Sequence, residues 1–127
     1  MQPEFFKPEK ITKGWGWEQV IENNKEFGFC GKILHYNRAD NISSYHFHPI
    51  KCEVFTCIAG KFRLYWADEK GNKIHQDLNL GDCVRLRPST PHQLQPLEDG
   101  SEILEVSTYH DDADVVRIAP GDSQKMV

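Results

Sequence analysis

The 127-residue sequence predicts an all-β fold, an antiparallel barrel or jelly roll, on three observations. Short stretches rich in β-branched and aromatic residues recur about every 8–12 residues, with glycine, proline, asparagine or aspartate between them. No apolar pattern with a period of about 3.6 residues lasts beyond a turn or two. Residues 61–67 alternate between polar and apolar side chains, which is typical of a strand with one buried face.

The strands are expected in a regular order along the chain. The first 13 residues are mostly polar, with the adjacent Phe5 and Phe6 as apolar anchors. We expect them to form an extended arm that is either disordered or lies along a partner subunit. The expected strands that follow are 17–21, 27–36, 44–48, 53–58, 61–67, 73–78, 84–87, 92–97 and 101–109, with a closing strand near 115–118.

Length and charge exclude several classes of protein. The chain has the size of one domain with a real core. A formal net charge of −4 argues against a general nucleic-acid surface, which needs a basic patch. No apolar run approaches the ~20 residues of a membrane span. The first residues lack the apolar segment of a signal peptide, so the expected location is cytoplasmic.

The four cysteines do not form a metal-binding pattern. Cys30, Cys52, Cys57 and Cys83 include no pair separated by two residues. We expect them to be buried, reduced thiols in preference to ligands of a zinc ion.

One histidine pair indicates a metal site. His46 and His48 are two positions apart, which on a strand points both imidazoles to one face. Glu53 has the wrong parity for the same straight strand, but Pro49 supplies a bend between them. Glu53 can then begin a neighbouring strand and face the histidines. A second stretch, residues 80–92, is a turn, a short strand, a proline-bracketed loop and His92, which would complete a set of three histidines and one glutamate.

These two stretches resemble the two motifs of the cupins. His46, His48, Glu53 and Gly60 match the spacing of the first motif, and Gly81 and His92 match the second. The chain departs from the motifs at turn positions, where family glycine, proline and asparagine residues are replaced by Asp40, Arg87, Ser89 and Pro96.

The resemblance implies a single cupin antiparallel β-barrel of the jelly-roll type over residues 14–118. Residues 1–13 are then an N-terminal arm, and residues 119–127 are a C-terminal tail. The four ligands suit one divalent transition metal, namely Zn²⁺, Mn²⁺, Fe²⁺, Ni²⁺ or Co²⁺. The alternative is a metal-free barrel of the same fold.

A narrower resemblance concerns the ligand. Residues 14–18, 31–34, 104–107 and 111–117, together with the metal motif, are similar to cupins of the mannose-6-phosphate isomerase type and of polysaccharide and nucleotide-sugar synthesis. This implies a small-molecule sugar or sugar-phosphate partner and an isomerase or epimerase in carbohydrate metabolism. A non-catalytic sugar-binding cupin and an iron-dependent dioxygenase remain open alternatives.

Two charged residues are candidate catalytic residues. Lys32 shares its strand parity with Cys30, Leu34 and Tyr36, which suggests that it points into the barrel. A buried ammonium needs an anionic partner, either a ligand phosphate, an enediolate at the metal, or Glu105, which is also a candidate proton-transfer base. The alternative is that the parity is reversed and Lys32 is solvated. The remaining histidines are expected outside the site: His75 on the surface, and His110 in a solvated cluster with the aspartates that follow it.

The outer face of one strand predicts a homodimer. If Glu53, Phe55 and Cys57 point inward, Val54, Thr56 and Ile58 point outward, beside an arm that carries two phenylalanines. Such an apolar patch is better accommodated against a second subunit.

Overall fold

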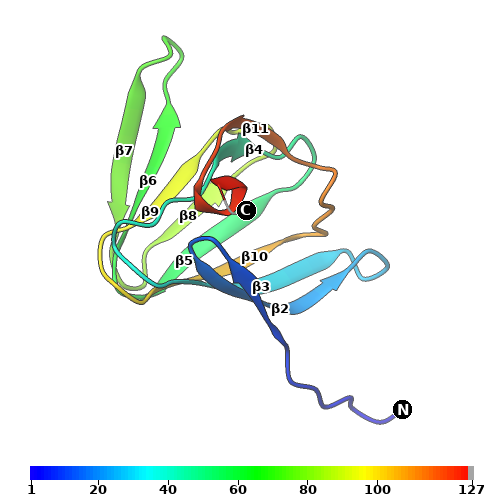
Figure 1. The fold of residues 1–127 in the computed structure, drawn as a ribbon. Coiled ribbons are helices and arrows are strands. Elements are labelled where there is room, and N and C mark those ends of the chain that lie inside the picture. The colour runs from blue at the N-terminus through cyan, green and yellow to red at the C-terminus, as the bar shows by residue number, and fades with distance from the viewer. Residues whose placement is uncertain (126–127) are drawn as a thin grey trace.

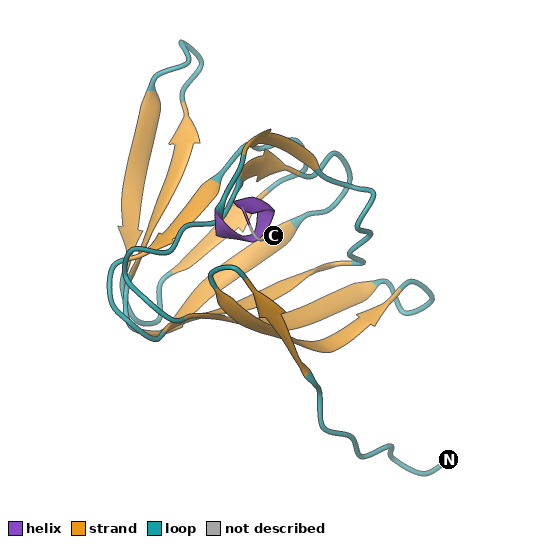
Figure 2. Cartoon of the chain, viewed as in Figure 1, coloured by secondary structure: helices purple, strands orange, loops and turns teal. Residues whose placement is uncertain are grey.

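The regular structure of the chain consists almost entirely of antiparallel strands, which are joined by loops and turns (Figure 2). The computed structural model describes residues 1–125, so the last two residues of the expected tail lie outside it. Within the described part the only helix is a short 3₁₀ turn, Asp122–Lys125, and no helix is long and apolar enough to cross a membrane. The strands are β1 (Lys10–Lys13), β2 (Gly16–Asn24), β3 (Phe29–Tyr36), β4 (Tyr45–Phe47), β5 (Glu53–Ala59), β6 (Phe62–Ala67), β7 (Lys73–Leu78), β8 (Cys83–Leu86), β9 (Gln93–Pro96), β10 (Ser101–Thr108) and β11 (Val116–Ala119).

Two layers of strands face each other (Figure 1). The larger sheet has the order β1-β2-β3-β10-β5-β8. The other layer contains two smaller sheets, β7-β6-β9 and β11-β4. An antiparallel bridge between His46 and His92 joins these two sheets. In this bridge the backbone N–H of each histidine donates to the carbonyl of the other, at 3.0 and 2.8 Å. The arrangement is a jelly-roll barrel, which confirms the predicted fold class.

The core lies between the two layers, and the predicted strand faces are confirmed. On β6, Phe62 and Leu64 are buried and pack on the inner face, as the alternation predicted. On β3, every second residue from Cys30 to Tyr36 is buried, and Lys32 is among them with 6% of its surface exposed. Because side chains alternate across a strand, these two observations fix which face of each sheet points inward.

The N-terminal segment is partly built into the larger sheet. Residues Lys10–Lys13, expected in the arm, form β1 and pair with β2. The preceding residues extend away from the barrel (Figure 1), with Phe5 94% and Phe6 66% exposed.

Candidate metal centre

Three histidines converge at one end of the barrel because β4 and the segment before β9 run side by side. His46 lies in β4 and His48 directly after it, so the two-residue spacing brings both imidazoles together. The backbone bridge to His46 places His92 beside them, with ring centroids 4.7 Å apart. One nitrogen from each ring lies within 4.8 Å of the others. The sequence prediction that His46, His48 and His92 meet is therefore confirmed.

Glu53 reaches the histidines from the opposite layer. We expected it to begin a strand next to that of the histidines. Instead, the bend at Pro49 carries the chain across the barrel, and β5 pairs with β10 and β8 in the larger sheet. Glu53 is 2% exposed, and its Oε1 lies 3.1 Å from Nε2 of His92 and 3.8 Å from Nε2 of His48. The glutamate thus faces the histidines across the cavity.

Backbone carbonyls orient all three imidazoles. Nδ1 of His46 contacts the carbonyl of Ser44 at 3.0 Å and also lies 2.8 Å from its hydroxyl. Nδ1 of His48 and Nδ1 of His92 make the equivalent contacts to the carbonyls of Asp114 (2.6 Å) and Thr90 (2.8 Å). A carbonyl only accepts, so the proton of each neutral ring is on Nδ1 and the lone pair is on Nε2. This is how metal-ligating histidines are usually held.

The contact between Glu53 and His92 brings together two buried acceptors that a cation would satisfy. Oε1 of Glu53 and Nε2 of His92 are both buried, and neither has a hydrogen-bond partner among the described residues. They lie 3.1 Å apart, and when the proton of His92 is on Nδ1 both atoms are acceptors. Buried acceptors without a donor are costly. A divalent metal ion among the three Nε2 atoms and Oε1 would satisfy both, so the residues present fit such an ion.

The pKa shifts in the site favour the forms that bind metals. Burial, together with the neighbouring His92 and His48, lowers the pKa of His46 to about 3. Burial and then the charge of Lys51 lower the pKa of His48. Burial alone would raise the pKa of Glu53, but the net shift is downward, and the ammonium of Lys51 contributes to this lowering. Neutral imidazoles and an ionised carboxylate are the protonation states that a metal requires.

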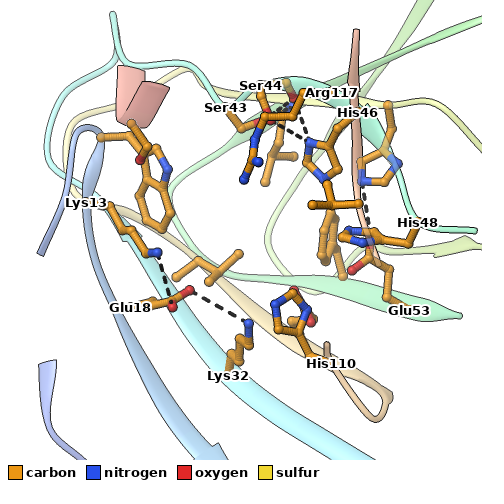
Figure 3. Close-up of a pocket in the computed structure, with 18 of the residues that line it drawn as sticks. Lys13, Glu18, Lys32, Ser43, Ser44, His46, His48, Glu53, His110 and Arg117 are labelled. Carbon is orange, nitrogen blue, oxygen red and sulfur yellow. Dashed lines mark hydrogen bonds and ion pairs between the residues drawn. The ribbon is translucent and has the colours of Figure 1, made fainter. Parts of the chain in front are cut away.

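The cavity in front of the histidines has a volume of about 390 Å³ and contains both predicted catalytic residues. Lys32 points into it (Figure 3), and its Nζ lies 4.0 Å from Oε2 of Glu18, a carboxylate that Lys13 also approaches at 3.6 Å. Lys32 is therefore directed inward, as its strand parity predicted. Glu105 is opposite Lys32 in the register of β10 and β3, but its carboxylate contacts Lys51 at 3.2 Å instead.

Two residues of the cavity were not predicted from the sequence. Lys51 is 3% exposed, and its Nζ lies 3.0 Å from Oε2 of Glu53. The expectation that His110 belongs to a solvated cluster is wrong, because its ring lines the cavity 6.0 Å from that of His48. The carboxylate of Asp112 does reach solvent, but it contacts the inner residue His110 at 2.9 Å. Lys51 and His110 both lie outside strands, where no alternation indicates which way a side chain points.

Comparison with known proteins identifies the fold. No protein-family model and no curated protein matches the chain. A structure of oxalate decarboxylase from Bacillus subtilis matches with a TM-score of 0.75 and 21% identity, covering 87% of this chain and 30% of that chain. The formate complex of Lactobacillus farciminis oxalate decarboxylase matches with a TM-score of 0.73 and 22% identity, covering 87% and 34%.

Oxalate decarboxylases are cupins, and the chain therefore has the cupin fold. It spans about a third of the length of these structures or less.

Proposed function

We propose that the chain is a cupin that binds one divalent transition metal through His46, His48, His92 and Glu53, and that it acts on a sugar or sugar phosphate. The observation that supports metal binding is a pair of buried acceptors, Glu53 Oε1 and His92 Nε2, for which the described residues offer no hydrogen-bond donor. The imidazoles of His46 and His48 lie beside them. When bound, such a metal would polarise a carbonyl or hydroxyl oxygen of the ligand.

The charges of the cavity support a ligand with an anionic group. Lys32 is buried, yet within the described residues its one contact with a carboxylate is the 4.0 Å approach to Glu18, which Lys13 shares. Arg117 also lines the cavity and forms no ion pair within the described residues. A phosphate or carboxylate of the ligand, bound between these cations, would compensate the buried charge of Lys32, which Glu18 compensates only in part.

The proposed reaction is an isomerisation or epimerisation. Lys32 would bind the anionic end of the ligand or a developing oxyanion, and Glu105 would move a proton. Glu105 is 4% exposed and lines the same cavity, so it is placed to reach a small ligand. Non-catalytic sugar binding requires the same pocket and metal, and iron-dependent dioxygenation requires the same ligands.

A second candidate ligand is a small carboxylic acid. The structures that share the fold are oxalate decarboxylases, and one contains formate. The same cations would bind a carboxylate as well as a phosphate.

One experiment separates these functions. Protein purified without a metal-affinity step is analysed for its metal and then incubated with hexoses, hexose phosphates and oxalate. Formation of an isomeric sugar, followed by NMR, is the expected result. Thermal stabilisation without turnover would indicate a binding protein. Oxygen consumption would indicate a dioxygenase, carbon dioxide release from oxalate a decarboxylase, and protein devoid of metal that takes up none would overturn the proposal.

Replacing Lys32 tests the anionic end of the ligand. We expect Lys32→Ala to retain the metal and the fold but to weaken binding of a hexose phosphate by roughly tenfold or more, because a charge-assisted contact contributes about 1.5–3 kcal/mol. Lys32→Arg should restore it poorly, since the pocket is shaped for a compact ammonium. Lys61→Ala, a change at an ion pair with Asp77 on the surface, is the control. Equal binding of hexose phosphate by Lys32→Ala and the parent would contradict this role.

The cysteines support a reducing compartment. All four are free thiols; Cys30 and Cys57 are buried as expected, whereas the expectation of burial is wrong for Cys52, which is half-buried, and for Cys83, which is exposed. Free thiols persist where glutathione keeps them reduced, so we include a cytoplasmic location in the proposal.

A further inference from the structure

Lys51 is a buried cation with a complete set of acceptors. Its Nζ lies 3.0 Å from Oε2 of Glu53, 3.2 Å from Oε2 of Glu105 and 3.0 Å from Nδ1 of His110. An ammonium has three N–H donors, so these three acceptors use all of them. The two carboxylates in contact with this buried ammonium compensate its charge.

The contact with Glu53 determines what that carboxylate can offer a metal. Oε2 is occupied by Lys51, and only Oε1 is directed at the imidazoles. We propose that Lys51 is a positioning residue for the metal centre, which holds Glu53 so that one oxygen faces the three histidines. This inference rests on the proposed metal site and adds a residue that determines its geometry.

The partners of Lys51 are themselves fixed. His110 accepts from Lys51 at Nδ1, so its proton is on Nε2, which donates to the carboxylate of Asp112 at 2.9 Å. The backbone N–H of Lys51 donates to the carboxylate of Asp114 at 2.9 Å, and the carbonyl of the same aspartate accepts from His48. The segment 110–114 therefore orients both Lys51 and a metal-binding histidine, which links the two.

Removal of the ammonium would release Glu53. Lys51→Met leaves two buried carboxylates without their shared cation, an arrangement that costs free energy unless one of them moves or is protonated. In either case Oε1 of Glu53 loses its fixed position. Outer residues that orient metal ligands typically contribute about 10–100-fold to metal affinity.

The test uses Co²⁺ as the probe, because its visible absorption reports the geometry of its ligands. We expect Lys51→Met to bind Co²⁺ roughly 10–100-fold more weakly and with an altered spectrum. In a Glu53→Ala background, the same Lys51→Met change should alter the dissociation constant by less than about twofold, because there is no carboxylate left to position. Equal effects in both backgrounds, or an unchanged spectrum and affinity, would overturn the proposal.

Two further variants make the result decisive. Lys32→Met removes another buried lysine of the same cavity that does not contact Glu53, so it should leave the Co²⁺ spectrum unchanged. If Lys51→Met fails to fold, the double variant Lys51→Met with Glu105→Gln is used instead, because it removes both the ammonium and one of the two carboxylates that it contacts. Its Co²⁺ binding is compared with that of Glu105→Gln alone. Failure of the parent protein to bind Co²⁺ would overturn the metal site itself, whereas normal binding by both parent and Lys51 variant would overturn only the role of Lys51.

Discussion

The three clustered histidines are oriented by hydrogen bonds to backbone carbonyls, which are close in the sequence for two of them and distant for the third. His46 and His92 bond to carbonyls two residues before them, so their own backbone sets the proton on Nδ1. His48 instead bonds to Asp114, 66 residues away in the sequence. The orientation of His48 therefore depends on the correct placement of the 110–114 segment, and it is the more sensitive reporter of the folded site.

Replacement of His48 tests the metal assignment directly. We expect His48→Ala to lose the metal and with it the stabilisation that the metal gives, about 2.7 kcal/mol when free metal is at 100 times the dissociation constant. Metal content and thermal unfolding with and without a chelator measure this. His75→Ala is the matched control, since His75 is exposed on β7. Full metal occupancy in His48→Ala would show that His48 is not a ligand of the metal.

The turn between β5 and β6 depends on a glycine of the first motif. Gly60 has a φ of 69°, and a Cβ at this position would lie 2.1 Å from the hydroxyl oxygen of Ser101. Ser101 is fully buried, and its hydroxyl bonds to the backbone of Lys61 and Glu98. Both the backbone conformation and the close packing of β10 therefore require glycine here.

Substitution at this turn should destabilise the barrel. Gly60→Ala is expected to cost more than the ~1–2 kcal/mol of a left-handed residue alone, because Ser101 must also move. Gly71→Ala is the control: Gly71 has a φ of 81°, but a Cβ there meets nothing within 4 Å. Denaturant unfolding of both variants separates the steric contribution from the conformational one. Equal destabilisation would show that the contact with Ser101 is unimportant.

The loop before His92 has a residue in the left-handed conformation at a position where the sequence departs from the cupin motif. Ser89 stands where the motif has glycine, and it is the one non-glycine residue with positive φ (64°) in the described chain. Its backbone N–H donates to the carbonyl of His48 at 2.7 Å. This contact ties the loop to His48 of the histidine cluster.

The outer face of the larger sheet is the surface on which we propose that two copies associate. Val54 and Thr56 of β5 are half-buried there, while Ile58 is 38% and the neighbouring Val106 of β10 is 48% exposed. Val106 pairs with Val54 in the strand register, so the apolar surface is continuous across the two strands. A second copy of the sheet, together with the exposed phenylalanines of the arm, would cover it.

An aspartate on this face should separate the copies. We expect the parent protein to be a dimer by light scattering at micromolar concentration and Val106→Asp to be a monomer, because a charge in the centre of an apolar interface is left without a partner. Ile74→Asp is the control, since Ile74 is similarly exposed, at 38%, on β7 of the other layer. A monomeric parent protein would refute the dimer.

The sequence by itself determined what depends on local order along the chain. Alternation of side chains predicted the inner faces of β3 and β6, and hence the inward direction of Lys32. The spacing of His46 and His48 predicted their common direction, and the turn chemistry around Pro49 predicted the bend that lets Glu53 face them. These features follow from the geometry of one strand or one turn, which the sequence specifies directly.

Only the tertiary structure decided which charges meet. Lys51, and not Lys32, binds Glu105, although the register of the two strands places Glu105 opposite Lys32. The contacts of Lys51 with Glu105 and His110 join residues 54 and 59 positions apart. Lys51 and His110 lie in irregular segments, where no period fixes side-chain direction, and their directions follow from how those segments pack across the barrel. For that reason the ligands of the proposed metal could be predicted from the sequence, whereas the residues that hold them in place could not.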